Sequence, residues 1–525
     1  MSQQQTFDYI VIGSGFGGSV SAMRLAEKGY RVLVIEKGKR WENKDFPKSN
    51  WNLKKYLWAP ALRWFGFMRL SFFREVFILS GVGVGGGSLV YANTLMMPPD
   101  PFFKNPVWAN FKNWKQTLAP FYEKARFMLG AERYEKENAE DLILKEVAAE
   151  MGKGDTYRRV DHVAVYLGDP HKEVDPYFNG EGPLRKGCTE CAGCMVGCRF
   201  NAKNTLDKNY LWFAEKKYGA TILAETETVK IEVLPDGRYQ VHTRSSTAFW
   251  AKKHQTFTSA GIVVSGGVLG TLDLLLKQKH LYKTLPNLSE KLGHNLLTNS
   301  EMLSGVVAAD RKLNHGVAIS TVFQADENTQ IELCKFPDGS SSMYRLAVTA
   351  AGAGSPLVRT AKMIGNTFRR PVDSWRALFK RNPARFAIVF LIMQTLPNAM
   401  RMRLKRGLFG TGLSFQNDTG AKVPSYIPIG QEALFRYAQK VNGVPQNSAP
   451  EVLFGMASTA HILGGCPMGV DAETGVVNER FEAFGYPNFY ILDGSIIPCN
   501  LGVNPSLTIT ALSEYAMNMV EKKSN

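Results

Sequence analysis

A glycine-rich turn between two short apolar runs near the start of the chain constrains the fold more than any other segment. Residues 7–12 are Phe-Asp-Tyr-Ile-Val-Ile, and residues 31–35 are Arg-Val-Leu-Val-Ile. Between them lie a G-x-G-x-x-G turn at residues 13–18 and a stretch with helical spacing of apolar residues. A strand, such a turn, a helix and a second strand predict a βαβ unit that binds a dinucleotide, and therefore an α/β fold with a parallel sheet.

Each position of this turn has a physical role. Gly13 makes the tight turn, Gly15 lets a pyrophosphate approach the backbone, and Gly18 lets the helix pack closely on the strand. Glu36 ends the second strand, where its carboxylate can accept hydrogen bonds from ribose hydroxyls. The pattern is common to NAD and FAD sites, so it predicts a nucleotide without choosing between them.

A second glycine-rich segment occupies residues 81–93 and includes Gly83 and Gly86. So many glycines indicate a backbone that lies close against a flat or charged group. Apolar, strand-like residues flank the segment, which argues against a mobile linker.

The C-terminal part contains an imidazole and a carboxamide within one motif-rich region. They belong to His461 and Asn504, which lie about forty residues apart. Pro505 follows Asn504, and proline is tolerated at the first position of a helix. A helix N-terminus carries partial positive charge, which suits an anionic ring. An imidazole has an ordinary pKa of about 6.5, so His461 is a candidate to transfer a proton near neutral pH.

These segments resemble the signatures of the glucose–methanol–choline (GMC) oxidoreductases, and Gly-Val-Asn-Pro at 502–505 is most similar to their cholesterol oxidase-like branch. The resemblance implies FAD as cofactor, with His461 orienting or deprotonating the alcohol and Asn504 hydrogen-bonding the developing carbonyl. It also implies an adenine contact through the backbone of Val229. The other residues that it places against the flavin are Ser88, Asn93, Asp493, Gly494 and Pro505.

The same resemblance predicts a Rossmann-like FAD-binding domain with a discontinuous second, substrate-binding lobe. We expect the FAD-binding domain to comprise residues 1–100, 220–300 and 455–525. The lobe would comprise residues 101–219 and 301–454, with a cysteine cluster at 188–198.

Cys188, Cys191, Cys194 and Cys198 follow the spacing C-x2-C-x2-C-x3-C, which is that of ferredoxin cluster ligands, although Arg199 replaces the usual proline. The fourth cysteine of such a run normally serves a second cluster, and no second run exists here. The alternatives are a [4Fe–4S] site, a cysteine loop without a cofactor, and zinc. A cluster would give the flavin an electron exit and make the protein a dehydrogenase, whereas oxygen is the expected acceptor without one.

The formal charge of +16 is unevenly distributed, since residues 359–406 contain twelve Lys and Arg and one acid, Asp373. Aromatic residues such as Phe368 and Trp375 are interleaved with them, which predicts amphipathic, basic helical material. Such material lies on anionic membrane surfaces or forms a solvated face. No nucleic-acid-binding motif accompanies the charge, so we expect no nucleic-acid partner.

The expected location is the cytoplasm, with peripheral membrane contact as an option. No apolar run reaches eighteen residues, and no secretion signal is evident. The seven cysteines suit a reducing compartment.

The leading functional hypothesis is FAD-dependent oxidation of a hydrophobic alcohol, most specifically the 3β-hydroxyl of a sterol. A long-chain fatty or terpenoid alcohol is the alternative substrate, and a flavin/iron–sulfur electron-transfer protein is the alternative of another class. Members of the cholesterol oxidase-like branch also isomerise a double bond with a carboxylate. Alignment places Ser341 at that position, and neither Asp338 nor Glu332 can be assigned to the role from the sequence.

Overall fold

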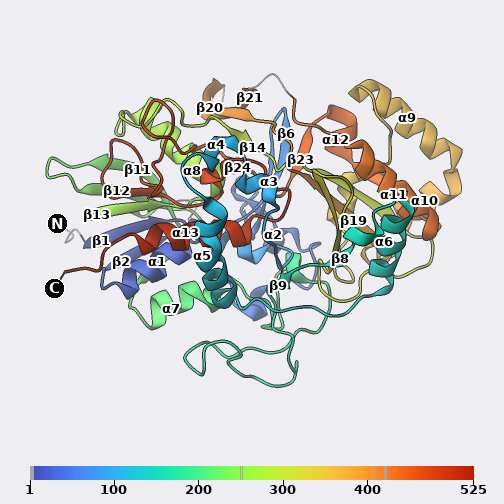
Figure 1. Cartoon of the computed structure of the whole chain (residues 1–525), viewed down its shortest axis with the longest axis horizontal. Coiled ribbons are helices and arrows are strands. Elements are labelled where there is room, and N and C mark those ends of the chain that lie inside the picture. Colours follow the sequence, from blue (N-terminus) through green and yellow to red (C-terminus); the bar gives the residue numbers. More distant parts are fainter. Residues whose placement is uncertain (1–4, 249, 251, 408–409, 419–421, 525) are drawn as a thin grey trace.

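Seven strands form a sheet beside which both ends of the chain lie, at the left in Figure 1. The computed structural model describes residues 5–248, 250, 252–407, 410–418 and 422–524. The strands in spatial order are β10 (Thr221–Leu223), β2 (Val32–Ile35), β1 (Gln5–Ile12), β13 (His254–Val264), β12 (Tyr239–Ser245) and β11 (Thr226–Val233), with β25 (Phe489–Ile491) paired to β13. The pairs among β10, β2, β1, β13 and β25 are parallel, which confirms the predicted α/β class.

The predicted strand–turn–helix–strand unit is present at the start of the chain. In β1 the last four residues are fully or almost fully buried, as expected of a parallel strand covered on both faces. Gly13 turns the chain with φ of 98°, a conformation that disfavours any side chain. Helix α1 (Phe16–Glu27) follows Gly15, and Ile35 at the end of β2 pairs with Ile12.

Four helices pack together on one face of this sheet, below it in Figure 1: α1, α5 (Trp114–Met128), α7 (Tyr210–Lys216) and α13 (Ser506–Asn518). The Tyr122 hydroxyl donates to Thr508 Oγ1 at 3.0 Å, and the rings of Trp114 and Tyr515 meet edge to face at 5.5 Å. Helices α5 and α7 come from residues 101–219, which the sequence led us to expect in the second lobe. The domain boundaries therefore stay a prediction, and these two helices argue for a larger nucleotide-binding part.

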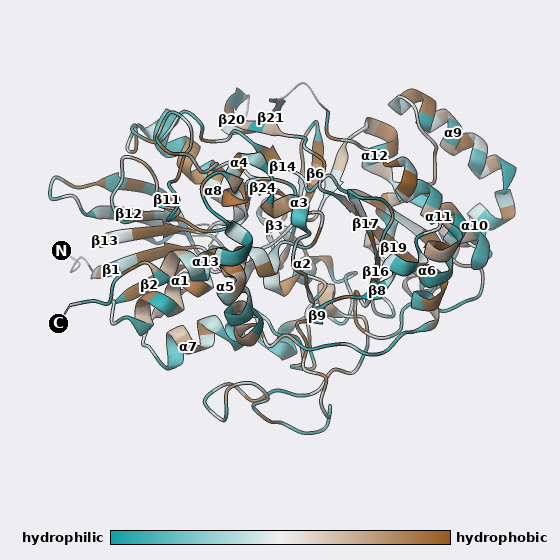
Figure 2. Ribbon diagram, viewed as in Figure 1, coloured by the Kyte–Doolittle hydropathy of each residue, from teal (hydrophilic) through white to brown (hydrophobic). Residues whose placement is uncertain are grey.

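A second, entirely antiparallel sheet of seven strands forms the other lobe, at the right in Figure 1. Its strands in order are β18 (Ala347–Thr349), β22 (Val444–Ser448), β15 (Met302–Val307), β19 (Ala387–Gln394), β17 (Thr329–Cys334), β16 (Thr321–Gln324) and β8 (Arg158–Arg159). Helices α6 (Ala139–Glu150) and α11 (Pro428–Lys440) pack on one face and share a buried apolar core with it. This core is brown in Figure 2, and the outer faces of the helices are largely teal.

The expectation that residues 359–406 are helical throughout is wrong in its second half. Helices α9 (Pro356–Arg369) and α10 (Pro371–Phe379) are present, but β19 and β20 (Met400–Gly407) follow them. Residues 387–393 form a continuous apolar run, which suits a buried strand as well as a buried helix, so periodicity could not decide between the two. None of the helices in the described part of the chain has the length and apolar character needed to cross a bilayer.

A small three-stranded sheet connects the two lobes. It contains β5 (Met68–Phe72), β6 (Val76–Gly81) and β23 (Ala457–Thr459), and β6 runs parallel to β23. Because parallel strands end at the same edge, the segments that follow β6 and β23 leave the sheet side by side. The glycine-rich segment 81–93 follows β6, and His461 follows β23, so two distant motifs meet at one edge.

Candidate active site

One elongated cavity runs from the N-terminal glycine turn to the second sheet. Gly15, Gly17, Ser265 and Gly267 line its nucleotide-domain end, and His461 and Asn504 face its interior. Its far wall is mostly apolar and includes Met68, Phe77, Leu79, Leu303, Phe336, Tyr344, Val389 and Leu391. The cavity therefore joins a dinucleotide turn, a polar pair and an apolar compartment.

His461 is held by a carboxylate that the sequence did not point to. Its Nδ1 contacts Glu301 Oε1, and Glu301 Oε2 accepts from the Ala460 amide at 2.7 Å. Glu301 is fully buried at the entrance to β15. With Nδ1 engaged in this way, Nε2 is the nitrogen left to meet a ligand in the cavity. Burial acts to lower the pKa of His461, but the charge and hydrogen bond of Glu301 outweigh it and raise the pKa above its ordinary value.

Asn504 lies directly before α13 and is 7% exposed. Its Nδ2 donates to Glu332 Oε2 at 3.3 Å, and its Oδ1 has no hydrogen-bond partner among the described residues. A buried amide oxygen without a partner is costly, so a ligand donor at this point would be stabilising. Pro505 caps the helix, and Pro505 and Ser506 both line the cavity, which brings the helix N-terminus to it.

Three residues were considered for the position of the isomerising carboxylate: Ser341, Asp338 and Glu332. The structure brings only Glu332 to the site. Glu332 lies on β17, is fully buried, and accepts from Gln330 Nε2 at 2.9 Å as well as from Asn504. Burial raises its pKa to about 7. Asp338 instead pairs with Arg385, and Ser341 accepts a hydrogen bond from Trp51 Nε1 at 2.9 Å.

The residues of the first glycine turn occupy different positions relative to the cavity. Gly15 lines it, and a Cβ added there would meet no atom within 4 Å. At Gly18 an added Cβ would stand 2.1 Å from the carbonyl oxygen of Gly13, so this glycine serves helix–strand packing. Glu36 is buried at the end of β2 and accepts from the Ser14 hydroxyl at 2.7 Å and the Gly38 amide at 2.8 Å.

The second glycine segment meets the first one closely. Gly83 and Gly86 both have positive φ, and a Cβ on Gly86 would lie 2.7 Å from the Gly15 Cα. The Ser88 hydroxyl donates to Gly85 O at 2.7 Å and accepts from the Leu206 amide, while Asn93 donates to Cys194 Sγ at 3.0 Å. Ser88 and Asn93 are both fully buried. The residues of this segment that line the elongated cavity include Gly87, Val90, Tyr91 and Ala92.

The remaining predicted cofactor residues divide into two groups. Asp493 and Gly494 line the cavity after β25, and Asp493 accepts from the Ser495 amide at 2.8 Å and from the Thr271 hydroxyl. Val229 lies on β11 where the pairing with β12 shifts register, and its carbonyl accepts from Gln278 Nε2 at 3.4 Å. An adenine contact by Val229 stays a prediction.

The four clustered cysteines lie apart from this cavity and are all free thiols. Among the described residues, no group of three or more His, Cys, Asp or Glu side chains is placed to hold a metal ion. A zinc ion needs its ligands to converge at about 2.0–2.3 Å, so the zinc alternative receives no support. The assignment of these cysteines as metal ligands remains a prediction.

Comparison with known proteins identifies the family. The GMC oxidoreductase profile matches residues 430–513, and an NAD(P)-binding Rossmann-like domain profile matches residues 11–41. A cholesterol oxidase of Acinetobacter baumannii is 40% identical, over 98% of this chain and 95% of that protein. The chain belongs to the GMC oxidoreductase family.

Two more distant proteins complete the comparison. The long-chain-alcohol oxidase FAO4B of Arabidopsis thaliana is 24% identical over 96% of this chain and 65% of its own length. The crystal structure of pyridoxine 4-oxidase from Mesorbium loti superposes with a TM-score of 0.60 at 15% identity, covering 98% of this chain and 99% of that one. This last likeness concerns the fold alone.

As a GMC oxidoreductase, the protein is an FAD-dependent enzyme that acts on alcohols, which confirms the predicted enzyme class and flavin cofactor. The residues present fit FAD. Gly15 and Gly267 leave open space along the cavity, and Asn504 Oδ1 is a buried polar atom without a partner among the described residues. A long group with polar edges would fill this space and satisfy this atom.

Proposed function

We propose that this enzyme oxidises the 3β-hydroxyl of a sterol and that its active site is the cavity containing His461 and Asn504. The observation that carries the proposal is the continuity of this cavity, which joins the dinucleotide turn to an apolar compartment large enough to be lined by more than ten apolar side chains. The name of the 40%-identical relative, cholesterol oxidase, indicates the same substrate class. The more distant long-chain-alcohol oxidase keeps a fatty or terpenoid alcohol as the alternative.

The proposed roles follow from the contacts. FAD, when bound along the glycine turns, accepts the carbinol hydride. Nε2 of His461 accepts the hydroxyl proton, because Glu301 engages Nδ1 and orients the ring. Asn504 hydrogen-bonds the oxygen as it becomes a carbonyl, and the N-terminus of α13 adds positive potential at the same end of the cavity. Oxygen is the electron acceptor that the names of the relatives indicate.

Glu332 is the residue that we propose for a second step, movement of the product's double bond. Its carboxyl group stands beside Asn504, and its pKa of about 7 lets it both take and return a proton near neutral pH. A β,γ-unsaturated ketone that loses a proton to such a base and regains one elsewhere becomes a conjugated ketone.

Anaerobic reduction of the bound flavin tests the substrate assignment. We expect a 3β-hydroxysterol to bleach the flavin absorption fast, and its 3α epimer, a fatty alcohol and a sugar to bleach it slowly or not at all. The products should contain a conjugated ketone in the wild type and an unconjugated one in Glu332→Gln. If a fatty or terpenoid alcohol bleaches the flavin while every sterol fails, the alternative substrate replaces the sterol.

We also propose that helices α9 and α10 dock this enzyme on an anionic membrane, at the cytoplasmic face. Their large apolar side chains are exposed, among them Leu357 at 85%, Phe368 at 76% and Trp375 at 66%. Lys362, Arg369 and Arg376 lie on the same two helices, and Arg370 lies between them. Brown and teal segments alternate along α9 in Figure 2, as expected of an amphipathic helix at an interface.

These helices lie beside the apolar compartment. The hydroxyl of Thr367 on α9 donates to Thr349 Oγ1 on β18 at 2.9 Å, and Ala347 at the start of β18 lines the cavity. A sterol leaving the bilayer at α9 would therefore enter the compartment nearby.

Sedimentation with lipid vesicles tests this surface. We expect binding to vesicles containing phosphatidylglycerol and much weaker binding to phosphatidylcholine alone. The variant F368S/W375S should bind about tenfold or more weakly, since each aromatic loses apolar burial worth about 1.5–3 kcal/mol. The matched control, L184S/V470S, removes exposed apolar groups elsewhere and should bind like the wild type. Equal binding by both variants, or a change in oligomeric state alone, would contradict membrane docking.

A further inference from the structure

All four cysteines of the C-x2-C-x2-C-x3-C run line one cavity, with a volume of about 430 Å³. The sequence left open whether the fourth cysteine, Cys198, serves a separate centre, as it does in two-cluster ferredoxins. In this fold Cys188, Cys191, Cys194 and Cys198 face the same space. The cavity is distinct from the alcohol cavity, and the adjacent residue Met195 lines that second cavity.

The cysteine cavity has a strong excess of positive charge. Five basic side chains and one acid line it: Lys48, Arg199, Lys203, Lys312, Arg385 and Asp338. The acid, Asp338, is already paired with Arg385. The field in this space therefore favours a negatively charged occupant.

Two of the nearby cations are buried without a carboxylate partner in the described part of the chain. Lys203 is fully buried, and its Nζ donates to the carbonyl oxygens of Leu89 at 3.1 Å and Cys194 at 2.6 Å. Arg185 is 2% exposed and donates to the carbonyl oxygen of Lys203 and to Asn204 Oδ1. A buried charge is costly unless a counter-charge offsets it. A negative group among the cysteines would supply that counter-charge.

The cysteine sulfurs are also placed as acceptors. Asn93 Nδ2 donates to Cys194 Sγ at 3.0 Å, and the Glu190 amide donates to Cys188 Sγ at 3.4 Å. A neutral thiol is a weak acceptor, whereas ligating thiolates of iron–sulfur proteins commonly receive such hydrogen bonds. Between the cysteines, Glu190 and Ala192 adopt the left-handed conformation, with φ of 55° and 54°, so the loop curls around the cavity.

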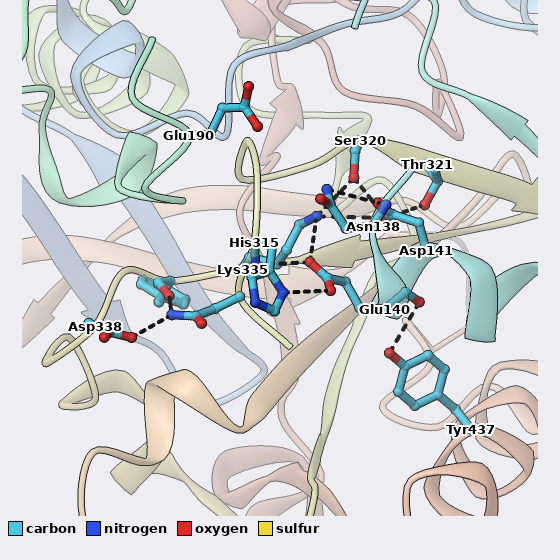
Figure 3. A network of polar contacts seen from close by, with 12 residues as sticks. Asn138, Glu140, Asp141, Glu190, His315, Ser320, Thr321, Lys335, Asp338 and Tyr437 are labelled. Atoms are coloured by element: carbon cyan, nitrogen blue, oxygen red, sulfur yellow. Dashed lines mark hydrogen bonds and ion pairs between the residues drawn. The ribbon is translucent and has the colours of Figure 1, made fainter. Parts of the chain in front are cut away.

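The opposite wall of the cavity is held by the polar network in Figure 3, in which Glu140 and Lys335 are fully buried. His315 contacts Glu140 at 3.2 Å, and Lys335 contacts Glu140 at 3.3 Å and Ser320 at 2.9 Å. The amide of Ala192 donates to Gly316 O at 2.9 Å, which ties the cysteine loop to this wall. The cavity is therefore a built site rather than a gap under a loose loop.

We propose that this cavity binds a [4Fe–4S] cluster through the thiolates of Cys188, Cys191, Cys194 and Cys198. In a cubane each thiolate binds its own iron, so the sulfurs stand further apart than the ligands of one ion. The described residues show no group of side chains that converges on a single metal ion. A cluster site does not need such convergence. A cluster bound by four thiolates would be an anion. It would supply the negative counter-charge that the buried cations Lys203 and Arg185 lack.

A cluster in this cavity would give the electrons a second exit, a role that rests on the proposed flavin chemistry. Cys194 lines the cysteine cavity, and the next residue, Met195, lines the alcohol cavity. Each alcohol oxidised would leave a hydride, which carries two electrons, on the flavin and the hydroxyl proton on His461. Two successive one-electron reductions of the cluster, each followed by transfer to an external one-electron carrier protein, would remove the electrons, and the protons pass to solvent.

Metal analysis of the full-length protein, purified without oxygen and reconstituted with ferrous iron and sulfide, tests the cluster. We expect about four iron and four acid-labile sulfide per chain, and an electron paramagnetic resonance signal after reduction with dithionite. Retention of no iron, or of stoichiometric zinc without sulfide, would overturn the proposal. FAD content and anaerobic bleaching by the alcohol are measured in the same sample, so failure of the cluster is distinguishable from failure of the proposed function.

Three variants locate the cluster. Cys191→Ser changes the exposed cysteine and should lose most of the iron, whereas Cys499→Ser, a buried cysteine outside the cavity, should keep all of it. Lys203→Met should keep the fold but shift the reduction potential of the cluster to more negative values, because a buried positive charge is removed. Equal iron contents in the two cysteine variants would contradict the assigned ligands.

Discussion

Replacing His461 by glutamine is expected to lower kcat/KM for the alcohol by about 10²–10⁴-fold, the usual contribution of a positioned general base. Glutamine retains a polar group near Glu301 but cannot accept a proton from the alcohol. The FAD contacts along Gly15 and Gly267 remain, so the purified variant should keep its flavin absorption. Stopped-flow measurement of anaerobic flavin reduction gives the effect on the chemical step directly.

His294→Gln is the matched control. His294 pairs with Asp418 at 3.0 Å and does not line the alcohol cavity, so its replacement should leave flavin reduction unchanged. Unaltered reduction by the alcohol in His461→Gln would remove the assigned base. It would favour the hypothesis of an electron-transfer protein, in which a partner rather than an alcohol reduces the flavin.

Replacing Glu301 by glutamine is expected to lower kcat by up to about 10⁴-fold, the effect of losing a carboxylate that holds a catalytic imidazole in one tautomer. The pH dependence should change as well. In the wild type, we expect the activity to fall as the pH drops through the raised pKa of His461, because a protonated ring cannot accept a proton. Without Glu301 burial dominates, the pKa of His461 falls, and this acidic limb should move to lower pH. Profiles of kcat/KM against pH for both proteins check the shift.

Glu451→Gln provides the control for loss of a buried carboxylate. Glu451 is fully buried and accepts a hydrogen bond from the amide of Leu303 at 3.0 Å, two residues after Glu301. Glu301 rather than Glu451 is the carboxylate that contacts His461. If the proposal holds, the Glu451→Gln variant should keep the acidic limb of the pH profile at its wild-type position. The proposal fails if both variants shift the limb equally, or if Glu301→Gln leaves it in place.

The parts of the molecule that follow from local sequence were predictable. The turn at residues 13–18 needs glycine for reasons of backbone geometry, and β1, α1 and β2 follow from apolar spacing, so the βαβ unit was expected and is present. His461 and Asn504 were singled out within short motifs, and the structure places both on one cavity.

The parts that depend on distant contacts were not predictable. Glu301 lies 160 residues from His461 and belongs to no recognisable motif, so its contact appears only in the fold. The position of Glu332 depends on the register of β17 in the second sheet, and alignment favoured Ser341 instead. The strand β19 was mistaken for part of a basic helical region, because a continuous apolar run carries no periodicity.

The parallel pairing of β6 with β23 has a consequence for how the enzyme can diversify. Val76, Phe77 and Ile78 pair in register with residues 457–459, so backbone hydrogen bonds tie the glycine segment after β6 to His461 after β23. The spacing between the glycine segment and His461 is thereby set by main chain, which is insensitive to side-chain substitution. Mutations in the antiparallel sheet can reshape the apolar wall while this spacing persists. The scaffold is therefore evolvable, since new substrates can be acquired by drift in one sheet without rebuilding the reaction geometry.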